Sequence, residues 1–518
     1  MDSYDIPPLE LNDEGEMDIN EPVDSVNSDD IVQSNVENVE SCGSSPSLET
    51  RDECVEKVKP VGYWLLRAKY NQKLTEMPDL RKECTTFQLK NERKLEKMPD
   101  IKEAFNSSIM KRIENGNYVL MEDIVKEHPE FKDFQKIFSP LNFALKPGSQ
   151  TTSCRPIVNS SFMPNGMGFS FNDCQFRGSS LNVNIQIITL RMRQYRHIQS
   201  SDLNNFYQTI KLSLQDSALN CVIWRESGFC SSGRLVVLCA TCVNYGMRMS
   251  QNIANLARNK TSEMFVQPIS EVAHDHVKHA QSDDVVVGHD NEEECERLKN
   301  IVDRGLQMGS FSWKPWVKSG SDIGVKTVGA EESIGCLGLT WHVQSDQWSL
   351  RLNLNISPKK RGARDANFDI KSVEDAERLF QVHGLTRRSA LRLCHSVYDP
   401  IFLFVQIKVT FSLLYRQIVV TLPDLDWDSP IPVQFHNDWI FAIKLALECE
   451  KVKVPRFCLK DSTKLEAWLG IVVDGAELAT LSCDKHDRLP FSVILGASRV
   501  FSVPQLMFYL LPLALRIL

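Results

Sequence analysis

The chain has 518 residues, of which 42% are hydrophobic and 24% charged, a composition typical of globular proteins. This length exceeds what one hydrophobic core supports, so we expect about three domains. No run approaches about 18 uninterrupted apolar residues, and the acidic N-terminus has no apolar segment, so we expect neither a membrane-spanning helix nor a secretory signal. The 15 cysteines are scattered, which favours free thiols in a reducing, intracellular compartment.

Charge is distributed unevenly along the chain. The net charge is −8, but residues 1–50 hold 14 of the acidic residues, and the rest of the chain is mildly basic. With little apolar surface to bury, residues 1–60 are predicted to be a disordered acidic tail. A mildly basic body is compatible with a phosphate-rich partner but does not require one.

The predicted elements begin with a helical region over residues 61–135, rich in Lys and Glu. Irregularly mixed strands and helices follow over residues 136–355, which predicts an α+β fold rather than a doubly wound sheet. The expected elements there are a strand at Arg155–Val158, a helix at Ile185–Arg196, a strand running into a helix over Ile198–Ile210, a hairpin of Cys221–Arg225 and Arg234–Thr241, a helix at Met247–Phe265, a strand–turn–strand at His279–Gly288, a helix at Cys295–Met308, and strands at Ile334–His342 and Trp348–Leu352.

Residues 356–450 are predicted to be helical, with hinges at Gly384 and Asp399-Pro400. A new unit begins near residue 451, with three strand candidates and a final helix over Pro504–Leu518.

Three acidic residues could perform chemistry. Asp202 follows an apolar-polar strand pattern, and Asp283-Asp284 stand at a predicted turn before Val285. An acidic pair at a tight turn, facing a third acid on another strand, could hold two divalent cations about 4 Å apart for phosphodiester synthesis. Taken alone, an Asp-Asp pair is more often a turn or capping residue on a solvated surface.

Further motifs accompany these acids in a fixed order. They are Leu145-Lys146-Pro147, Arg155–Ser160, Phe171–Cys174, Ser201–Ile210, Asn244-Tyr245-Gly246, Gln281–Asp284, Phe311–Trp316 and Leu337–Trp341. In this order they resemble the reverse transcriptases of the Pao/BEL class of LTR retrotransposons, from about residue 85 to residue 518. The resemblance implies a right-hand polymerase, with fingers and palm over residues 136–355 and a thumb and connection over residues 356–450.

The resemblance also implies a role for each site residue. Asp202, Asp283 and Asp284 would be the catalytic ligands of two Mg²⁺ ions, with Mn²⁺ as an alternative. The residues implied to bind the nucleotide are Lys146 and Arg155 on the triphosphate, Tyr207 as the gate against ribose, and Tyr245 with Gly246 at the start of a helix motif. The residues implied to form the primer grip are Leu337, Gly338, Leu339 and Trp341.

The sequence departs from the family pattern at several positions. Gln281 replaces the Tyr that precedes the acidic pair in the family, and the family's helix-motif proline falls near Gln251. Pro315 replaces a basic residue, although Lys314 is adjacent. Either a decayed genomic copy or a polymerase with altered kinetics would carry such changes.

Residues 451–518 resemble a degenerate, truncated RNase H-like α/β domain. Asp474 matches the family's first metal-binding carboxylate, although a turn between strands explains Asp474-Gly475 equally well. Met507 stands where the later helix carries a Glu. One carboxylate would hold two metals poorly, so no RNase H activity is expected.

The sequence therefore predicts an RNA-directed DNA polymerase segment of a retrotransposon polyprotein. Its expected partners are an RNA or DNA template with primer, dNTPs and other parts of the polyprotein, but no membrane. Its expected location is the cytoplasm, including virus-like particles, or the nucleus. One alternative is a non-enzymatic nucleic-acid-binding remnant. Another is an unrelated α+β scaffold in which the acids of positions 202 and 283 lie far apart.

Overall fold

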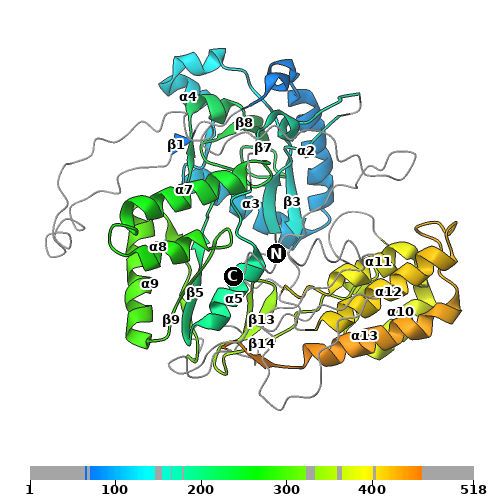
Figure 1. Ribbon diagram of the computed structural model, residues 1–518. Helices are drawn as coiled ribbons and strands as arrows, with labels where there is room; N and C mark the ends of the chain where they lie inside the picture. Colours follow the sequence, from blue (N-terminus) through cyan, green and yellow to red (C-terminus); the bar gives the residue numbers. More distant parts are fainter. Residues whose placement is uncertain are drawn as a thin grey trace. The chain divides into compact units, whose positions relative to one another are not determined.

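A computed structural model describes residues 65–66, 70–145, 154–164, 166–177, 180–321, 333–358, 365–400 and 404–457 (Figure 1). Several predictions lie outside these residues: the acidic tail, the role of Lys146, and the strands, helix and Asp474 of the segment beyond residue 457. The chain divides into two compact units. Unit 1 comprises Met1–Asn182, Ser201–Val285 and Leu298–Pro315, and unit 2 comprises Val183–Ser200, Val286–Arg297 and Trp316–Leu518.

Helices open the described part of unit 1, as the sequence predicts. They are α2 (Arg81–Leu95), α3 (Pro99–Glu114) and α4 (Met121–Glu127), with 3-10 turns at Gln72–Glu76 and Pro129–Asp133. Proline suits the first turn of α3 because its missing N–H would have no partner inside the helix.

Two antiparallel sheets pack with these helices in unit 1. Strands β2 (Tyr118–Leu120), β8 (Leu235–Ala240) and β7 (Cys221–Arg225) form one sheet in that order. Strands β3 (Leu141–Leu145) and β4 (Cys154–Val158) form the other. Both the predicted hairpin and the predicted strand at Arg155–Val158 are confirmed, because alternate or continuous apolar side chains fill the core between sheet and helices.

Strand β5 (His197–Asn204) carries Asp202 and has several partners. It pairs antiparallel with β10 (Ser312–Trp313) within unit 1 and with β11 (Val317–Lys318) within unit 2, and β9 (Asp284–His289) also pairs with it. The helix predicted after this strand is wrong. Asn205 adopts a left-handed backbone conformation (φ 48°), so the chain turns there instead.

Several further elements complete the description of the chain up to residue 307. They are α6 (Leu214–Ala218), β6 (Lys211–Leu212) pairing with β1 (Leu65–Leu66), α7 (Ser250–Phe265), α8 (Glu271–Lys278) and α9 (Glu292–Gln307). The strand predicted before the acidic pair is wrong, because α8 runs to Lys278 and leaves room only for one bridge at Gln281.

A four-stranded antiparallel sheet organises unit 2. Its order is β12 (Ser333–Cys336), β13 (Leu339–His342), β14 (Gln347–Ser349) and β15 (Val454–Pro455). The predicted strand at Ile334–His342 is in fact two strands, because Leu337 and Gly338 both have positive φ and form a turn. Helix α5 (Ile185–Gln194) contributes Ile188 and Met192 to the same core.

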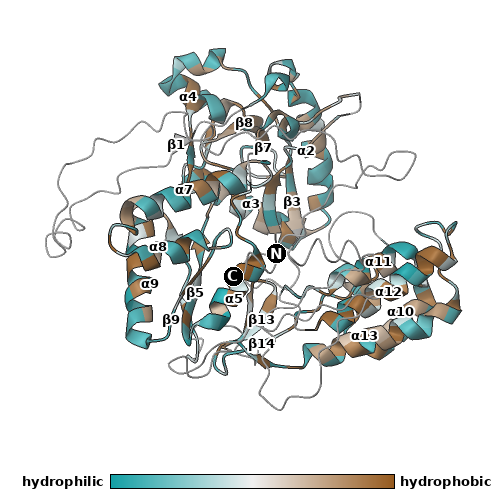
Figure 2. Ribbon diagram, in the orientation of Figure 1, coloured by the Kyte–Doolittle hydropathy of each residue, from teal (hydrophilic) through white to brown (hydrophobic). Residues whose placement is uncertain are grey.

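Four helices complete unit 2 and confirm the helical prediction for this stretch. They are α10 (Val373–His383), α11 (Arg387–Ser396), α12 (Val405–Thr421) and α13 (His436–Glu450), with short turns at Ala366–Phe368 and Val433–Phe435. Ser372 and Thr386 cap α10 and α11 through side-chain oxygens, and Gly384 (φ 71°) makes the hinge between them. Figure 2 shows α12 and α13 as more apolar than α8 and α9.

The mixed α and β class is thus confirmed. Among the helices of the described ranges, none combines the length and apolar character needed to cross a bilayer.

Candidate active site

Asp202 lies on β5 at a position that faces away from the core. Burial alternates along the strand, with Leu203 buried and Asp202 half-buried, as expected for side chains that point to opposite faces. The backbone N–H of Leu203 donates to the carbonyl of Asp283 at 2.9 Å. This hydrogen bond places the acidic turn beside the C-terminal end of β5.

The acidic pair sits on a tight two-residue turn. Gln281 and Asp284 exchange two backbone hydrogen bonds, both of 2.9 Å, and Ser282 between them has a left-handed φ of 56°. That conformation costs a non-glycine residue about 1–2 kcal/mol. Strained backbone of this kind persists only where its surroundings hold it in place.

Arg258 on α7 holds this turn. Its guanidinium is fully buried and donates through Nη1 to the carbonyl of Ser282, while Nε and Nη2 donate to the side chain of Asn259. Burial lowers the pKa of Arg258 to about 10, and the negative charge of Asp283 opposes that shift. The sequence analysis missed Arg258. The available signal was a cation on the apolar face of a predicted helix, between Ala254 and Thr261.

The carboxyl groups of Asp202 and Asp284 are in hydrogen-bond contact. Burial raises the pKa of Asp284 well above its ordinary value, and the hydrogen bond to Asp202 and the charges of Asp202 and Asp283 add to this. Burial also acts to raise the pKa of Asp202, but the hydrogen bond from Asp284 and the ion pair with Lys314 outweigh it and lower that pKa. The ionised form is thus favoured at Asp202 and the protonated form at Asp284.

The pKa of Asp283 is also raised. Burial and then the charge of Asp202 raise its pKa, while the charges of Lys314 and Arg155 counteract the rise. Lys314 reaches Asp202 through its ammonium, and its backbone N–H donates to the Asp202 carbonyl at 2.9 Å. The three acids thus lie on adjacent segments, Asp202 on β5 and Asp283-Asp284 at the turn into β9, two strands that pair with each other (Figure 1).

Four of the predicted nucleotide-binding residues also gather in unit 1. The Tyr207 and Tyr245 rings pack edge to face, with 4.8 Å between their centres, and the Arg155 guanidinium lies 5.2 Å from the centre of the Tyr245 ring. Gly246 follows with a φ of 109°, and an added Cβ would stand 1.9 Å from the Val158 carbonyl oxygen. Only glycine allows this close approach of the two chain segments.

The predicted primer-grip residues lie in unit 2. Leu337 and Gly338 form the turn between β12 and β13, and Leu339 and Trp341 are fully buried in the core. Trp341 therefore anchors the hairpin and does not stack on a base. Leu337 is buried as well (4% exposed), so Gly338 is the member of this set that is partly exposed.

The donor chemistry of the acids suits a hard divalent cation. All three groups offer oxygen ligands, which Mg²⁺ prefers, and their raised or coupled pKa values reflect negative charge that a cation would neutralise. Within the described ranges, however, no three His, Cys, Asp or Glu side chains are grouped closely enough to form a finished metal site. A cation would require Lys314 to leave Asp202 and the side chains to rearrange.

Comparison with known proteins connects the chain to retrotransposons. Residues 386–483 match the family model of the Pao retrotransposon-like RNaseH-like domain. This match bears out the resemblance to Pao-type elements over these residues, which are similar to the RNase H-like region of such elements. The match includes α11, α12, α13 and β15, and so it crosses the predicted boundary between residues 450 and 451.

The other comparisons add little. No curated protein matches the chain. Among solved structures, it is similar to a foamy viral protease–reverse transcriptase in complex with double-stranded DNA, with 10% identity and a TM-score of 0.38. The alignment covers 65% of this chain and 46% of the viral chain. A score this low does not establish a shared fold.

Proposed function

We propose that this chain is the RNA-directed DNA polymerase segment of a retrotransposon polyprotein. The observation that carries the proposal is the hydrogen bond of 2.9 Å from the Leu203 N–H to the Asp283 carbonyl, which holds the turn of Asp283 and Asp284 against the strand that carries Asp202. Buried acids that repel one another are costly to a fold and are typical of sites that bind cations or move protons.

Each neighbouring residue has a role in this proposal. Two bound Mg²⁺ ions, with Mn²⁺ as an alternative, would activate the primer hydroxyl and neutralise the leaving pyrophosphate. Asp202 and Asp283 would hold the ions, with Asp284 assisting. Arg155 would bind the triphosphate, and Tyr207, packed against Tyr245, would exclude a ribose 2′-hydroxyl.

The proposed organisation follows the right-hand plan. Residues 136–355 would form the fingers and palm, residues 356–450 the thumb and connection, and residues 451–518 a degenerate RNase H-like domain without hydrolytic activity. The substrates would be dNTPs and a primer on an RNA or DNA template.

Primer extension on a homopolymer RNA template tests this function. The parent and Asp283→Asn are compared with Mg²⁺ and with Mn²⁺, and Asp303→Asn serves as the control because Asp303 lies on α9, where its side chain accepts a hydrogen bond from Gln307. The parent and the control should extend the primer, whereas Asp283→Asn should lose at least about a hundredfold in rate, or about 2.7 kcal/mol of transition-state stabilisation.

A second candidate is a nucleic-acid-binding remnant without turnover. The ion pair between Lys314 and Asp202 favours it, because it occupies one of the carboxylates that a cation requires. Equal signals from the parent and Asp283→Asn would support the remnant and contradict the polymerase.

A further inference from the structure

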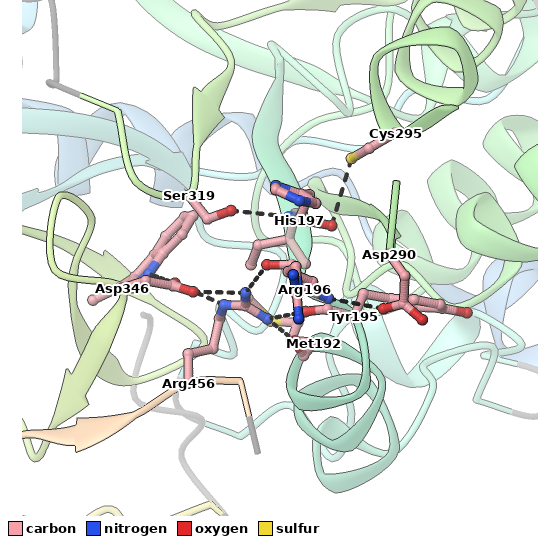
Figure 3. Close-up of polar contacts among 11 residues, drawn as sticks. Met192, Tyr195, Arg196, His197, Asp290, Cys295, Ser319, Asp346 and Arg456 are labelled. Atoms are coloured by element: carbon pink, nitrogen blue, oxygen red, sulfur yellow. Dashed lines mark hydrogen bonds and ion pairs between the residues drawn. The ribbon is translucent and has the colours of Figure 1, made fainter. Parts of the chain in front are cut away.

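Arg456 follows β15 directly, and its guanidinium is completely buried and fully bonded (Figure 3). Nε and Nη2 donate to the two carboxylate oxygens of Asp346, both at 2.7 Å. Nη1 donates to the carbonyls of Met192 and Tyr195, the latter at 2.8 Å, and Nη2 donates to that of Arg196 at 2.8 Å. A guanidinium has five N–H donors, so none is left over.

Of the carbonyls that Arg456 binds, that of Met192 lies in the last turn of α5, which finishes at Gln194, and those of Tyr195 and Arg196 follow directly after the helix. The last carbonyls of a helix have no partner within it and carry the negative end of its dipole. A buried cation at this position both satisfies these groups and compensates their charge. Arg456 therefore fixes the end of α5.

The carboxylate that Arg456 binds belongs to the turn of the β13–β14 hairpin. Asp346 has a left-handed φ of 50°, and its carbonyl also accepts the backbone N–H of Arg456 at 3.0 Å. Its Oδ1 accepts a hydrogen bond from Trp341 Nε1 at 3.0 Å. Because Trp341 is on β13, the strand that follows the Leu337-Gly338 turn, Arg456 is linked through one carboxylate to the predicted primer grip.

Removing only one partner of the Arg456–Asp346 ion pair should cost more stability than removing both. Removing one member of a buried ion pair leaves the other charge without compensation, and here it would also leave helix carbonyls without donors. Lysine cannot replace arginine, because an ammonium is a point charge with three donors and cannot bind a carboxylate and three carbonyls at once.

We propose that Arg456 is a positioning residue for the primer strand. It acts through Asp346 and Trp341 to hold the β13–β14 hairpin, so that a segment inside the RNase H-like family match is also part of the primer-holding apparatus. The inference rests on the proposed polymerase function, because the primer role of the Leu337-Gly338 turn belongs to that proposal.

The test uses Arg456→Lys in the full chain with three readouts. They are hydrogen exchange in peptides covering residues 339–349, the dissociation constant for a primer–template duplex, and the KM and kcat of primer extension. Arg388→Lys is the matched control, because Arg388 also forms a two-bond pair with an aspartate, Asp428, but at a more exposed place in unit 2.

Arg456→Lys should accelerate exchange in the hairpin and weaken primer–template binding about tenfold or more, as expected when a positioning element shifts by a fraction of an ångström. The KM for primer–template should rise in parallel, while kcat at saturating duplex stays within about twofold because the carboxylates in unit 1 are untouched. Arg388→Lys should change none of these. Faster exchange with unchanged binding would mean that Arg456 only stabilises the fold, and this result would overturn the proposal.

A second variant is used if Arg456→Lys does not fold. Arg456→Met combined with Asp346→Leu removes both charges, and such paired replacements of a buried ion pair are often tolerated. This double variant should fold and show the same loss of primer–template affinity, and parental affinity would overturn the proposal. If the parent binds the duplex but extends no primer, the polymerase function fails, whereas the binding constants of the Arg456 variants still decide whether this residue positions the duplex.

Discussion

Asp346 in unit 2 and the acidic group of unit 1 are both carboxylates withdrawn from solvent beside a buried arginine, yet their charges are balanced differently. Asp346 has one guanidinium that satisfies both of its oxygens. Asp202, Asp283 and Asp284 crowd together with Lys314 and Arg258, and two of the three acids have raised pKa values. A matched pair is what a stable fold requires, whereas an unmatched group of like charges marks a site shaped by function.

The largest effect on stability is expected at the matched pair. Arg456→Met leaves Asp346 without its cation and the end of α5 without donors, so the free energy of unfolding should fall by about 3–5 kcal/mol. Arg388→Met breaks a pair whose side chains are 28% and 43% exposed, so it should cost no more than about 1 kcal/mol. Urea unfolding of both variants measures the difference, and equal losses would contradict the assignment of Arg456 as the more important link.

The next effect concerns the backbone under the nucleotide-binding residues. Gly246→Ala places a Cβ 1.9 Å from a carbonyl oxygen, at a φ of 109° that alanine disfavours, so unfolding should become easier by about 1–3 kcal/mol and dNTP affinity should drop. Gly116→Ala is the control, because its φ is also positive (68°) but no atom lies within 4 Å of an added Cβ. This control should cost only about 1 kcal/mol. Thermal melts and dNTP titrations compare the two variants. If both variants change dNTP affinity equally, the assignment of Gly246 to the nucleotide-binding site is contradicted.

The smallest effect has the opposite sign. Asp284→Asn removes a carboxyl whose pKa is raised by burial and by its acidic neighbours, so without divalent cations it should stabilise the fold at pH 8 by about 0.5–2 kcal/mol. A carboxyl with a raised pKa contributes its stability while protonated, below its ordinary range, and loses it as the pH rises through the shifted value. The parent in EDTA should therefore lose stability as the solution becomes alkaline, and Mg²⁺ should restore it.

Melting temperatures of the parent and Asp284→Asn, measured across this pH range with EDTA or Mg²⁺, test that sign. A parent whose stability is independent of both pH and Mg²⁺ would contradict the charge imbalance. Asp346→Asn is the contrasting variant, since removing a charge that is already paired with Arg456 should destabilise the fold.

Sequence reasoning reached the parts of the molecule that local pattern determines. The hairpin of β7 and β8, the long helices and the turn at the acidic pair follow from apolar periodicity and turn residues, whereas the joint role of Asp202 and Asp283 was predicted from the order of motifs in the family resemblance. The predictions from local pattern were wrong where one residue adopts a left-handed backbone conformation. Asn205 ends β5 in a turn where a helix was predicted, and Leu337 divides one predicted strand into two.

Sequence reasoning missed the contacts between distant segments that decide the chemistry. Nothing local to Arg258 indicates that it binds the Ser282 carbonyl, and the five donors of Arg456 go to groups far away along the chain. Both cations were recognisable only as charges in apolar surroundings. Their partners depend on how the elements pack, which a linear pattern does not contain.

Primer extension by the parent and by Asp283→Asn, on a homopolymer RNA template with Mg²⁺ or Mn²⁺, tests the central claim most directly. If the converging carboxylates hold cations beside a primer end, the parent adds nucleotides and the variant, which keeps the turn and the side-chain size, does so at least about a hundredfold more slowly. Indistinguishable rates, or no extension by either protein, would contradict a polymerase built on Asp202, Asp283 and Asp284.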